Sequence, residues 1–153
     1  MGATKDGEKR LVAIGEGLRE SEEAWREVLL DLKRRGLSVG PEVATGDGAL
    51  GFWAAFGKAY PKTKHQRCSV QKTCNIIDKL PKSSHGKATG LLKGIYAADT
   101  RKQAEEAIDH FCGVFAPKHS KAVDCLVKDK AALLTFYDFP AEHWVHIRTT
   151  NPI

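Results

Sequence analysis

The order of apolar and polar residues over the first 80 positions predicts four short strands. An apolar run at Leu11–Ile14 is typical of a buried strand, and Glu42–Thr45 has the pattern of a second short strand. A weaker pattern predicts a strand over Lys64–Cys68. The Asp-Gly pair inside Lys5–Glu8 supplies the positive φ angles of a hairpin turn, which places one more strand near residues 2–4.

Helical spacing of apolar residues predicts a helix after each of the last three strands. The clearest follows Ser21, a residue suited to the N-cap, and ends before Gly36, which suits the position just past a helix. Its apolar face consists of Trp25, Val28, Leu29 and Leu32. A second helix is expected over about 49–59 and a third over 70–80. The third helix is expected to turn inward Val70, Cys74, Ile77 and Leu80.

Beyond residue 83 the pattern becomes helical throughout. We expect helices over about 84–98, from Thr100 (as the cap) to Phe115, and over about 119–137, before an irregular tail. Strands that alternate with helices and then give way to helices alone predict an α/β sheet with a helical appendage.

The net charge of +5 is unevenly distributed along the 153 residues. Residues 61–102 carry ten basic and two acidic side chains, whereas both flanking parts are close to balanced. Charge alone leaves two interpretations open, a surface that faces a polyanion or a solvated helical face rich in lysine. If the first is correct, the candidate phosphate contacts are Lys62, Lys64, Arg67, Lys72, Lys79, Lys82, Lys87 and Lys93.

Several classes of protein are disfavoured by what the sequence lacks. No apolar run approaches the roughly 18 residues of a membrane-spanning helix, and residues 1–7 do not have the apolar stretch of a signal peptide. We therefore expect a cytoplasmic protein with no membrane partner. The cysteines are then read as reduced thiols, since four are too few for a disulfide scaffold.

Asp47 is the residue most suggestive of chemistry. It lies between Gly46 and Gly48, where a predicted strand ends and a predicted helix begins. Ligands of α/β sheets gather at the carboxyl ends of strands, and flanking glycines would let a metal or a phosphate approach the backbone. A carboxylate at this position is also a common helix N-cap, and the residues alone leave both roles open.

Other familiar sites are absent from the sequence. The spacing of Cys68 and Cys74 does not fit a zinc site. There is neither a G-x-x-x-x-G-K-[ST] phosphate loop nor a G-x-S-x-G nucleophile elbow.

Several longer segments resemble the Mutator-type transposases of bacterial insertion sequences. They are RESEEAWREVLLDLKRRGL (19–37), GDGALGFW (46–53), HQRC (65–68), CLVKD (125–129), FYDFPAEHW (136–144) and RTTNPI (148–153). The segments keep their order and cover nearly the whole chain, which makes the resemblance far more specific than a single motif.

This resemblance implies an incomplete ribonuclease-H-like sheet with helices, followed by an all-helical segment. It implies a catalytic core in residues 1–80, and in 81–153 a helical insertion with the lead-in to a catalytic glutamate. Members of this family use an Asp-Asp-Glu triad to hold two Mg²⁺ ions for DNA cleavage and strand transfer, because magnesium prefers oxygen ligands. Asp47 matches the second aspartate of that triad.

The other two carboxylates of the triad have no counterpart in this sequence. The first aspartate is expected on a strand upstream of the hairpin, and the glutamate directly after Asn151-Pro152-Ile153. We therefore expect a catalytically inactive fragment of a DNA transposase that binds DNA and is associated with the nucleoid. The alternative is a truncated regulatory or inhibitory module that associates with full-length transposase or with itself.

The family's Cys-x-x-His motif is altered here. Cys68 is present, but Gln71 stands where the resemblance implies histidine, and glutamine cannot be protonated. A second departure concerns the sheet, whose central strand the resemblance places upstream. We expect either a closed-up sheet, with strand 10–14 beside strand 42–45, or an association-prone protein with unpaired inner edges.

Overall fold

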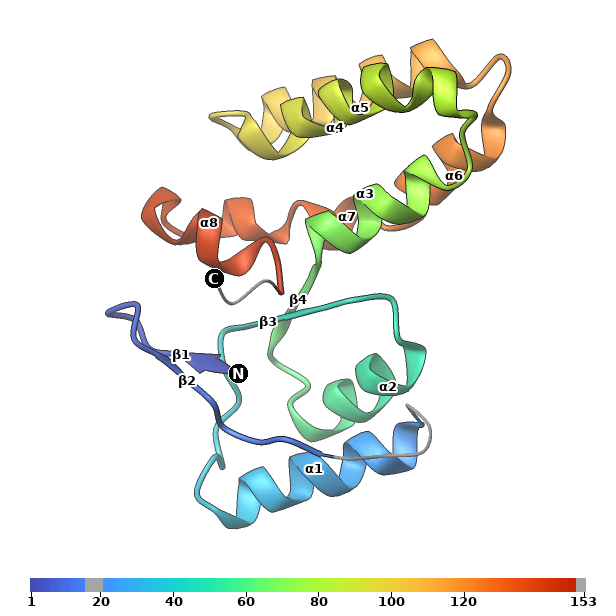
Figure 1. The fold of residues 1–153 in the computed structure, drawn as a ribbon. Helices are drawn as coiled ribbons and strands as arrows, with labels where there is room; N and C mark the ends of the chain where they lie inside the picture. Colours follow the sequence, from blue (N-terminus) through green and yellow to red (C-terminus); the bar gives the residue numbers. More distant parts are fainter. Residues whose placement is uncertain (16–20, 151–153) are drawn as a thin grey trace.

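Helices dominate the residues that the computed structural model describes, which are 1–15 and 21–150, and two small sheets accompany them (Figure 1). The elements run in the order β1, β2, α1, β3, α2, β4, α3, and helices α4 to α8 follow. This order confirms the predicted α/β class and the predicted helical second half. The Asn-Pro-Ile motif at 151–153 lies outside the described residues.

The predicted hairpin near the start of the chain is confirmed. β1 (Gly2–Ala3) pairs antiparallel with β2 (Lys9–Arg10), and Gly7 takes the positive φ of +83° that its turn requires. The amide of Thr4 donates to the carbonyl of Glu8 over 2.9 Å, which closes the turn.

The prediction of a buried strand over Leu11–Ile14 is wrong. β2 ends at Arg10, and the side chains of Leu11 and Ile14 are 60% and 78% exposed. The closed-up sheet is also wrong, because β1–β2 and β3–β4 are separate two-stranded sheets. A backbone carbonyl in this stretch bonds to a helix instead of a strand: Val12 accepts from the Arg35 guanidinium at 2.9 Å.

The second sheet is a parallel pair connected by a helix. β3 (Val43–Gly46) and β4 (Lys64–Arg67) lie side by side, and α2 (Leu50–Ala59) connects them. All three nearly coincide with the predicted ranges. The register places Gly46 opposite Arg67, so the residues that follow β3 lie beside the end of β4. The sheet thereby brings Asp47 and Arg67 to one edge.

Helix α1 (Glu22–Arg34) has the ends that its sequence predicts. The Ser21 side chain accepts from the amide of Ala24 at 3.1 Å, and Gly36 follows the helix with a φ of +108°. α1 packs on α2 at one end of the molecule (Figure 1). The buried residues of this N-terminal cluster are Leu29, Ala55, Phe56 and Tyr60.

The larger core belongs to the helices that follow β4. These are α3 (Ser69–Ile77), α4 (His85–Ala97), α5 (Arg101–Phe115), α6 (Ser120–Lys128), α7 (Lys130–Leu133) and α8 (Trp144–Ile147), with short 3-10 turns at Lys82–Ser84, Thr135–Asp138 and Ala141–His143. The Thr100 side chain caps α5 by accepting from the amide of Gln103 at 3.2 Å, as predicted. The helical cluster is built around the buried residues Ile76, Leu92, Ile95, Ile108, Phe111, Leu126 and Leu133.

Two helical predictions are wrong in detail. The helix expected over 119–137 is interrupted at Asp129, whose backbone (φ −110°, ψ 14°) separates α6 from α7. Of the face predicted to turn inward, Ile77 and Leu80 pack in the helical cluster as expected, whereas Val70 and Cys74 are exposed and Lys72 and Ile76 are buried instead. No helix of residues 1–15 and 21–150 is long and apolar enough to cross a membrane.

Candidate functional site

Asp47 is an exposed side chain directly after β3. Its Oδ1 accepts from the amide of Ala49 at 3.0 Å, and its carbonyl accepts from the Trp53 indole at 2.8 Å. The carboxylate therefore meets an amide just before α2, while Ala49 occupies the N-cap position. Asp47 is thus held by the start of the helix and still faces solvent.

The two glycines beside Asp47 make room for side chains of the protein. A Cβ at Gly46 would lie 2.8 Å from the Trp53 ring and 2.9 Å from the Phe52 ring. A Cβ at Gly48 would lie 2.7 Å from a terminal nitrogen of Arg67. The glycines thus admit two aromatic rings and a guanidinium to the backbone around Asp47, where the sequence suggested room for a metal or a phosphate.

Arg67 and Lys72 are buried and share one carboxylate. Arg67 Nε lies 3.3 Å and Lys72 Nζ 2.6 Å from Oδ2 of Asp129, and the two basic side chains are 7% and 4% exposed. Burial by itself would raise the pKa of Asp129, but the hydrogen bonds and charges of Lys72 and Arg67 outweigh it and hold that pKa below its ordinary value. The carboxylate is therefore ionised at neutral pH.

One nitrogen of this cluster has no partner. Arg67 NH1 is buried and makes no hydrogen bond to any of the described residues. Its neighbour in the strand, Gln66, is fully satisfied: its amide nitrogen donates to Leu133, and its oxygen accepts from the amide of Phe136. The cluster is thus fixed through β4 but has an unused donor.

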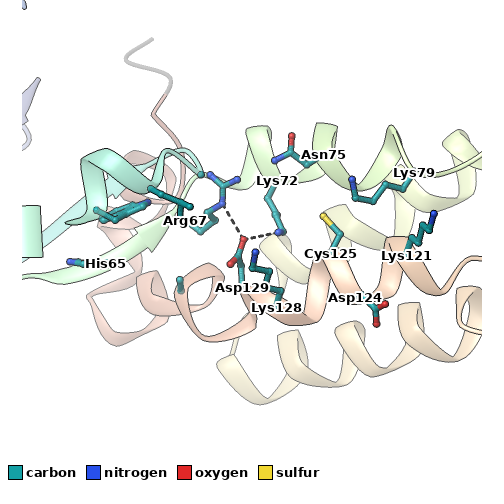
Figure 2. Close-up of a pocket in the computed structure, with 14 residues that line it drawn as sticks. His65, Arg67, Lys72, Asn75, Lys79, Lys121, Asp124, Cys125, Lys128 and Asp129 are labelled. Atoms are coloured by element: carbon teal, nitrogen blue, oxygen red, sulfur yellow. Dashed lines mark hydrogen bonds and ion pairs between the residues drawn. The ribbon is translucent and has the colours of Figure 1, made fainter. Parts of the chain in front are cut away.

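Arg67, Lys72 and Asp129 line a cleft of about 670 Å³ between α3 and α6 (Figure 2). The cleft begins at Gly48 and Trp53 beside Asp47. Five cations face two carboxylates around it; the cations are Arg67, Lys72, Lys79, Lys121 and Lys128, and the carboxylates are Asp124 and Asp129. Burial lowers the pKa of His65, which also lines the cleft, so this ring is neutral at pH 7. The cleft is therefore net positive.

The eight predicted phosphate contacts do not form one surface patch in this cleft. Arg67, Lys72 and Lys79 line it. Lys64 is exposed but paired with Asp138 at 3.0 Å. The remaining four are exposed outside the lining of the cleft, and they are Lys62, Lys82, Lys87 and Lys93.

Two lysines that line the cleft lie outside residues 61–102, the basic segment of the sequence. Lys121 and Lys128 lie seven residues apart on α6, which places both on the same side of that helix. They belong to residues 103–153, where basic and acidic side chains nearly balance, so a charge count over that segment does not reveal them. Helical spacing of like charges is the signal that finds them.

Cys68 anchors a distant segment to the same strand end. The residue is 1% exposed, and its sulfur lies 3.4 Å from the amide and from the hydroxyl of Thr150. Burial would raise the pKa of the Cys68 thiol, but hydrogen bonds from the backbone at Gln71 and from Thr150 lower it below its ordinary value. Gln71 itself is exposed.

Two further bonds attach this segment. The hydroxyl of Thr45 donates to the carbonyl of Ile147 at 2.5 Å, and the amide of Ser69 donates to the carbonyl of Arg148 at 2.9 Å. Residues 147–150 therefore lie against the carboxyl ends of β3 and β4, at the edge that carries Asp47.

The described residues do not fit a pair of magnesium ions by themselves. Within residues 1–15 and 21–150 there is no group of three or more His, Cys, Asp or Glu side chains placed to hold a metal. Asp47 provides one exposed carboxylate, and two ions that each prefer several oxygen ligands need more than that.

Comparison with known proteins gives consistent matches. The family model described as "Transposase, Mutator family" matches residues 1–153. The chain is 54% identical over 153 residues to the transposase for insertion sequence element IST2 of Acidithiobacillus ferrooxidans, covering 100% of the chain and 52% of that protein. It is 48% identical to the transposase for IS6120 of Mycolicibacterium smegmatis, again over 100% of the chain and 47% of that protein. The chain spans about half the length of these curated relatives.

Proposed function

Because the chain belongs to the Mutator family of transposases, we propose that it is the part of a DNA transposase that holds DNA and supplies one catalytic carboxylate, Asp47. The observation that carries this proposal is the place of Asp47. It is exposed at the carboxyl end of β3 and directly precedes Gly48, which lines a cleft with five cations and two carboxylates. Metal-dependent cleavage of a polyanion combines several metal-binding carboxylates with cations that hold the phosphates, and Asp47 would contribute one of those carboxylates.

The arrangement of the strands supports a ribonuclease-H-like core as part of the proposal. β3 and β4 are parallel and joined by α2, as in an α/β sheet, and ligands of such sheets bind at the carboxyl ends of strands. Residues 147–150 are attached at that same edge. The family resemblance implies a glutamate directly after residue 153, and that glutamate would follow this attached segment in the chain.

Magnesium belongs to the proposal only in the context of the longer family protein. Asp47 would be one of its ligands, and the ions would supply charge stabilisation for phosphoryl transfer. The described residues of this chain contribute positioning instead: the Ala49 amide and the Trp53 indole hold the Asp47 segment in place.

Duplex binding by this chain tests the proposal. A labelled duplex of about 30 base pairs is titrated with the chain at two sodium chloride concentrations. If about four lysines or arginines contact phosphates, counterion release lowers the affinity on the order of 100-fold between 50 and 200 mM salt. Binding that does not respond to salt contradicts the proposal.

A pair of matched variants locates the contact. Lys79→Gln removes an exposed cation of the cleft and should reduce the salt slope by about one unit. Lys102→Gln removes another exposed cation, on α5 and outside the cleft lining, and should leave the slope unchanged. Equal effects of the two substitutions would mean that the cleft does not hold the DNA.

A second candidate function is a regulatory module that pairs with full-length transposase. The small sheets favour it, since β3–β4 has only two strands and β1–β2 does not join it within the described residues. A sheet edge can pair with a strand of another chain. Addition of this chain should then reduce strand transfer by a full-length family member. The chain should also co-purify with that protein. No reduction of strand transfer and no co-purification would exclude this function.

A further inference from the structure

We propose that the Arg67 guanidinium, fixed by Asp129 and seated against Gly48, binds a phosphodiester of the DNA backbone next to Asp47. This inference rests on the proposed function and adds a specific phosphate site to it. Asp129 acts through Arg67 and is a positioning residue.

Charge balance is the first argument. Arg67 and Lys72 are both nearly buried, and they share a single oxygen of one carboxylate. This leaves the cluster with one uncompensated positive charge, and buried charges in proteins are normally paired. An anion at the cleft completes the pairing.

The unpaired nitrogen is the second argument. A guanidinium has five N–H donors, and Arg67 NH1 is buried without a hydrogen-bond partner among the described residues. Leaving such a donor unsatisfied is costly, and native proteins rarely do so without a functional reason. A phosphate offers the acceptor oxygens that match the planar fork of arginine, which makes it the fitting ligand.

Gly48 supplies the third argument. The terminal Arg67 nitrogen NH2 would be 2.7 Å from a Cβ at Gly48, so only glycine lets the guanidinium approach this backbone. The register that pairs Gly46 with Arg67 brings the same guanidinium to the edge where Asp47 follows. A phosphate bound by Arg67 would therefore lie at the end of the cleft that Gly48 lines, directly after Asp47 in the chain.

The most specific test displaces the Arg67 guanidinium while leaving every charged residue in place. Gly48→Ala places a methyl group against the end of the flexible Arg67 side chain and so displaces it without removing a cation. Gly113→Ala is the matched control, because a Cβ there meets nothing within 4 Å. Both variants are compared with the unaltered chain.

Inorganic phosphate is the first probe. Thermal unfolding is measured in 50 mM phosphate and in sodium chloride of equal ionic strength. Binding to the folded state should raise the Tm of the unaltered chain and of Gly113→Ala by about 2–5 °C more than that of Gly48→Ala. Exclusion of phosphate from protein surfaces stabilises all three alike and cancels in this comparison. Equal rises in Tm for the unaltered chain and both variants would overturn the proposed phosphate site.

A labelled duplex is the second probe. Loss of a charge-assisted contact should weaken duplex binding by Gly48→Ala about tenfold, while Gly113→Ala binds as the unaltered chain does. A phosphate-dependent shift together with unchanged duplex affinity overturns the assignment to DNA and indicates a small phosphorylated ligand. Failure of the unaltered chain to bind duplex contradicts the proposed function and the DNA assignment together, and the phosphate probe still decides whether the site exists.

The positioning role of Asp129 has its own measurement. Asp129→Asn should lose the phosphate-dependent shift in Tm, and Asp129→Glu, which keeps the carboxylate, should restore part of it. If the asparagine variant keeps the full shift, Arg67 does not depend on Asp129 for phosphate binding.

Discussion

Lys72 donates to Asp129 at 2.6 Å, although 57 residues separate them in the chain. The lysine is on the inward face of α3, and the aspartate occupies the break between α6 and α7. The ion pair therefore links the break between α6 and α7 to α3, the helix that follows β4. Its removal should affect stability as well as the cleft.

Asp129→Asn should destabilise the chain by about 2–3 kcal/mol, because it removes the carboxylate that pairs with two nearly buried cations. Urea unfolding at pH 7 measures this difference. Asp124→Asn is the control, since Asp124 is an exposed carboxylate that lines the same cleft. An equally small loss for both variants would contradict the structural role of Asp129.

The pH dependence of stability should differ between the unaltered chain and Asp129→Asn. The pKa of Asp129 is lowered in the folded state, so its stabilising contribution is complete above the pKa of the unfolded chain, near 4. The contribution is lost as pH falls from there through the lower pKa of the folded state. The stability advantage over Asp129→Asn should therefore shrink between pH 5 and more acidic conditions (about pH 2–3), and a constant advantage over this range would refute the assignment.

The chain alone should neither cleave DNA nor transfer strands with magnesium or manganese. One carboxylate, Asp47, does not provide enough oxygen ligands to organise two ions. Nicking of a plasmid that carries the ends of the cognate element is the measurement. Metal-dependent nicking that disappears in Asp47→Ala would show this expectation to be wrong.

Lysines of the cleft should contribute more to DNA binding than lysines of α4. The double variant Lys121→Gln/Lys128→Gln removes two charges from the cleft, and Lys87→Gln/Lys93→Gln removes two exposed charges from α4. Titration of a labelled duplex at one salt concentration should show the larger loss for the first variant. A larger loss for the α4 variant would instead support a surface centred on residues 61–102.

The two clusters of buried residues should open at different free energies. The N-terminal cluster rests on Leu29, Phe56 and two further buried residues, whereas the helical cluster is far larger. Local opening is easier where few apolar contacts hold an element, so amides of α1 and α2 should exchange on the order of tenfold faster than those of α5. Hydrogen exchange measures this, and equal protection would indicate a single cooperative unit.

Helix ends and the order of elements were predictable because their causes are local. Ser21 and Thr100 cap α1 and α5 through bonds to amides three residues away, and Gly36 ends α1 with a positive φ. Such signals do not depend on the rest of the fold. The parallel pair β3–β4 was predicted only as two separate strands, since its register depends on long-range pairing.

The buried face of α3 was only partly predictable from apolar spacing, because Ile77 packs inward as expected but a lysine also belongs to this face. Lys72 is acceptable inside only because Asp129 reaches it from a distant part of the chain. Burial of residues 11–14 would likewise require a neighbouring strand, and no strand of residues 1–15 and 21–150 pairs with them. For the same reason the cleft could not be deduced: Lys121 and Lys128 meet Arg67 only after α6 has packed on α3.

The hydrogen bond from Thr45 to Ile147 joins two points that lie 102 positions apart in the chain, and so closes a long loop. The entropy cost of closing such a loop grows only with the logarithm of its length, by about 0.6 kcal/mol for each doubling. Helices α4 to α6 lie within this loop, and Arg148 beside its end donates to the carbonyl of Tyr96 on α4. Insertions in the exposed turn at residues 116–118, between α5 and α6, should therefore lengthen the protein at little energetic cost and without separating Asp47 from residues 147–150.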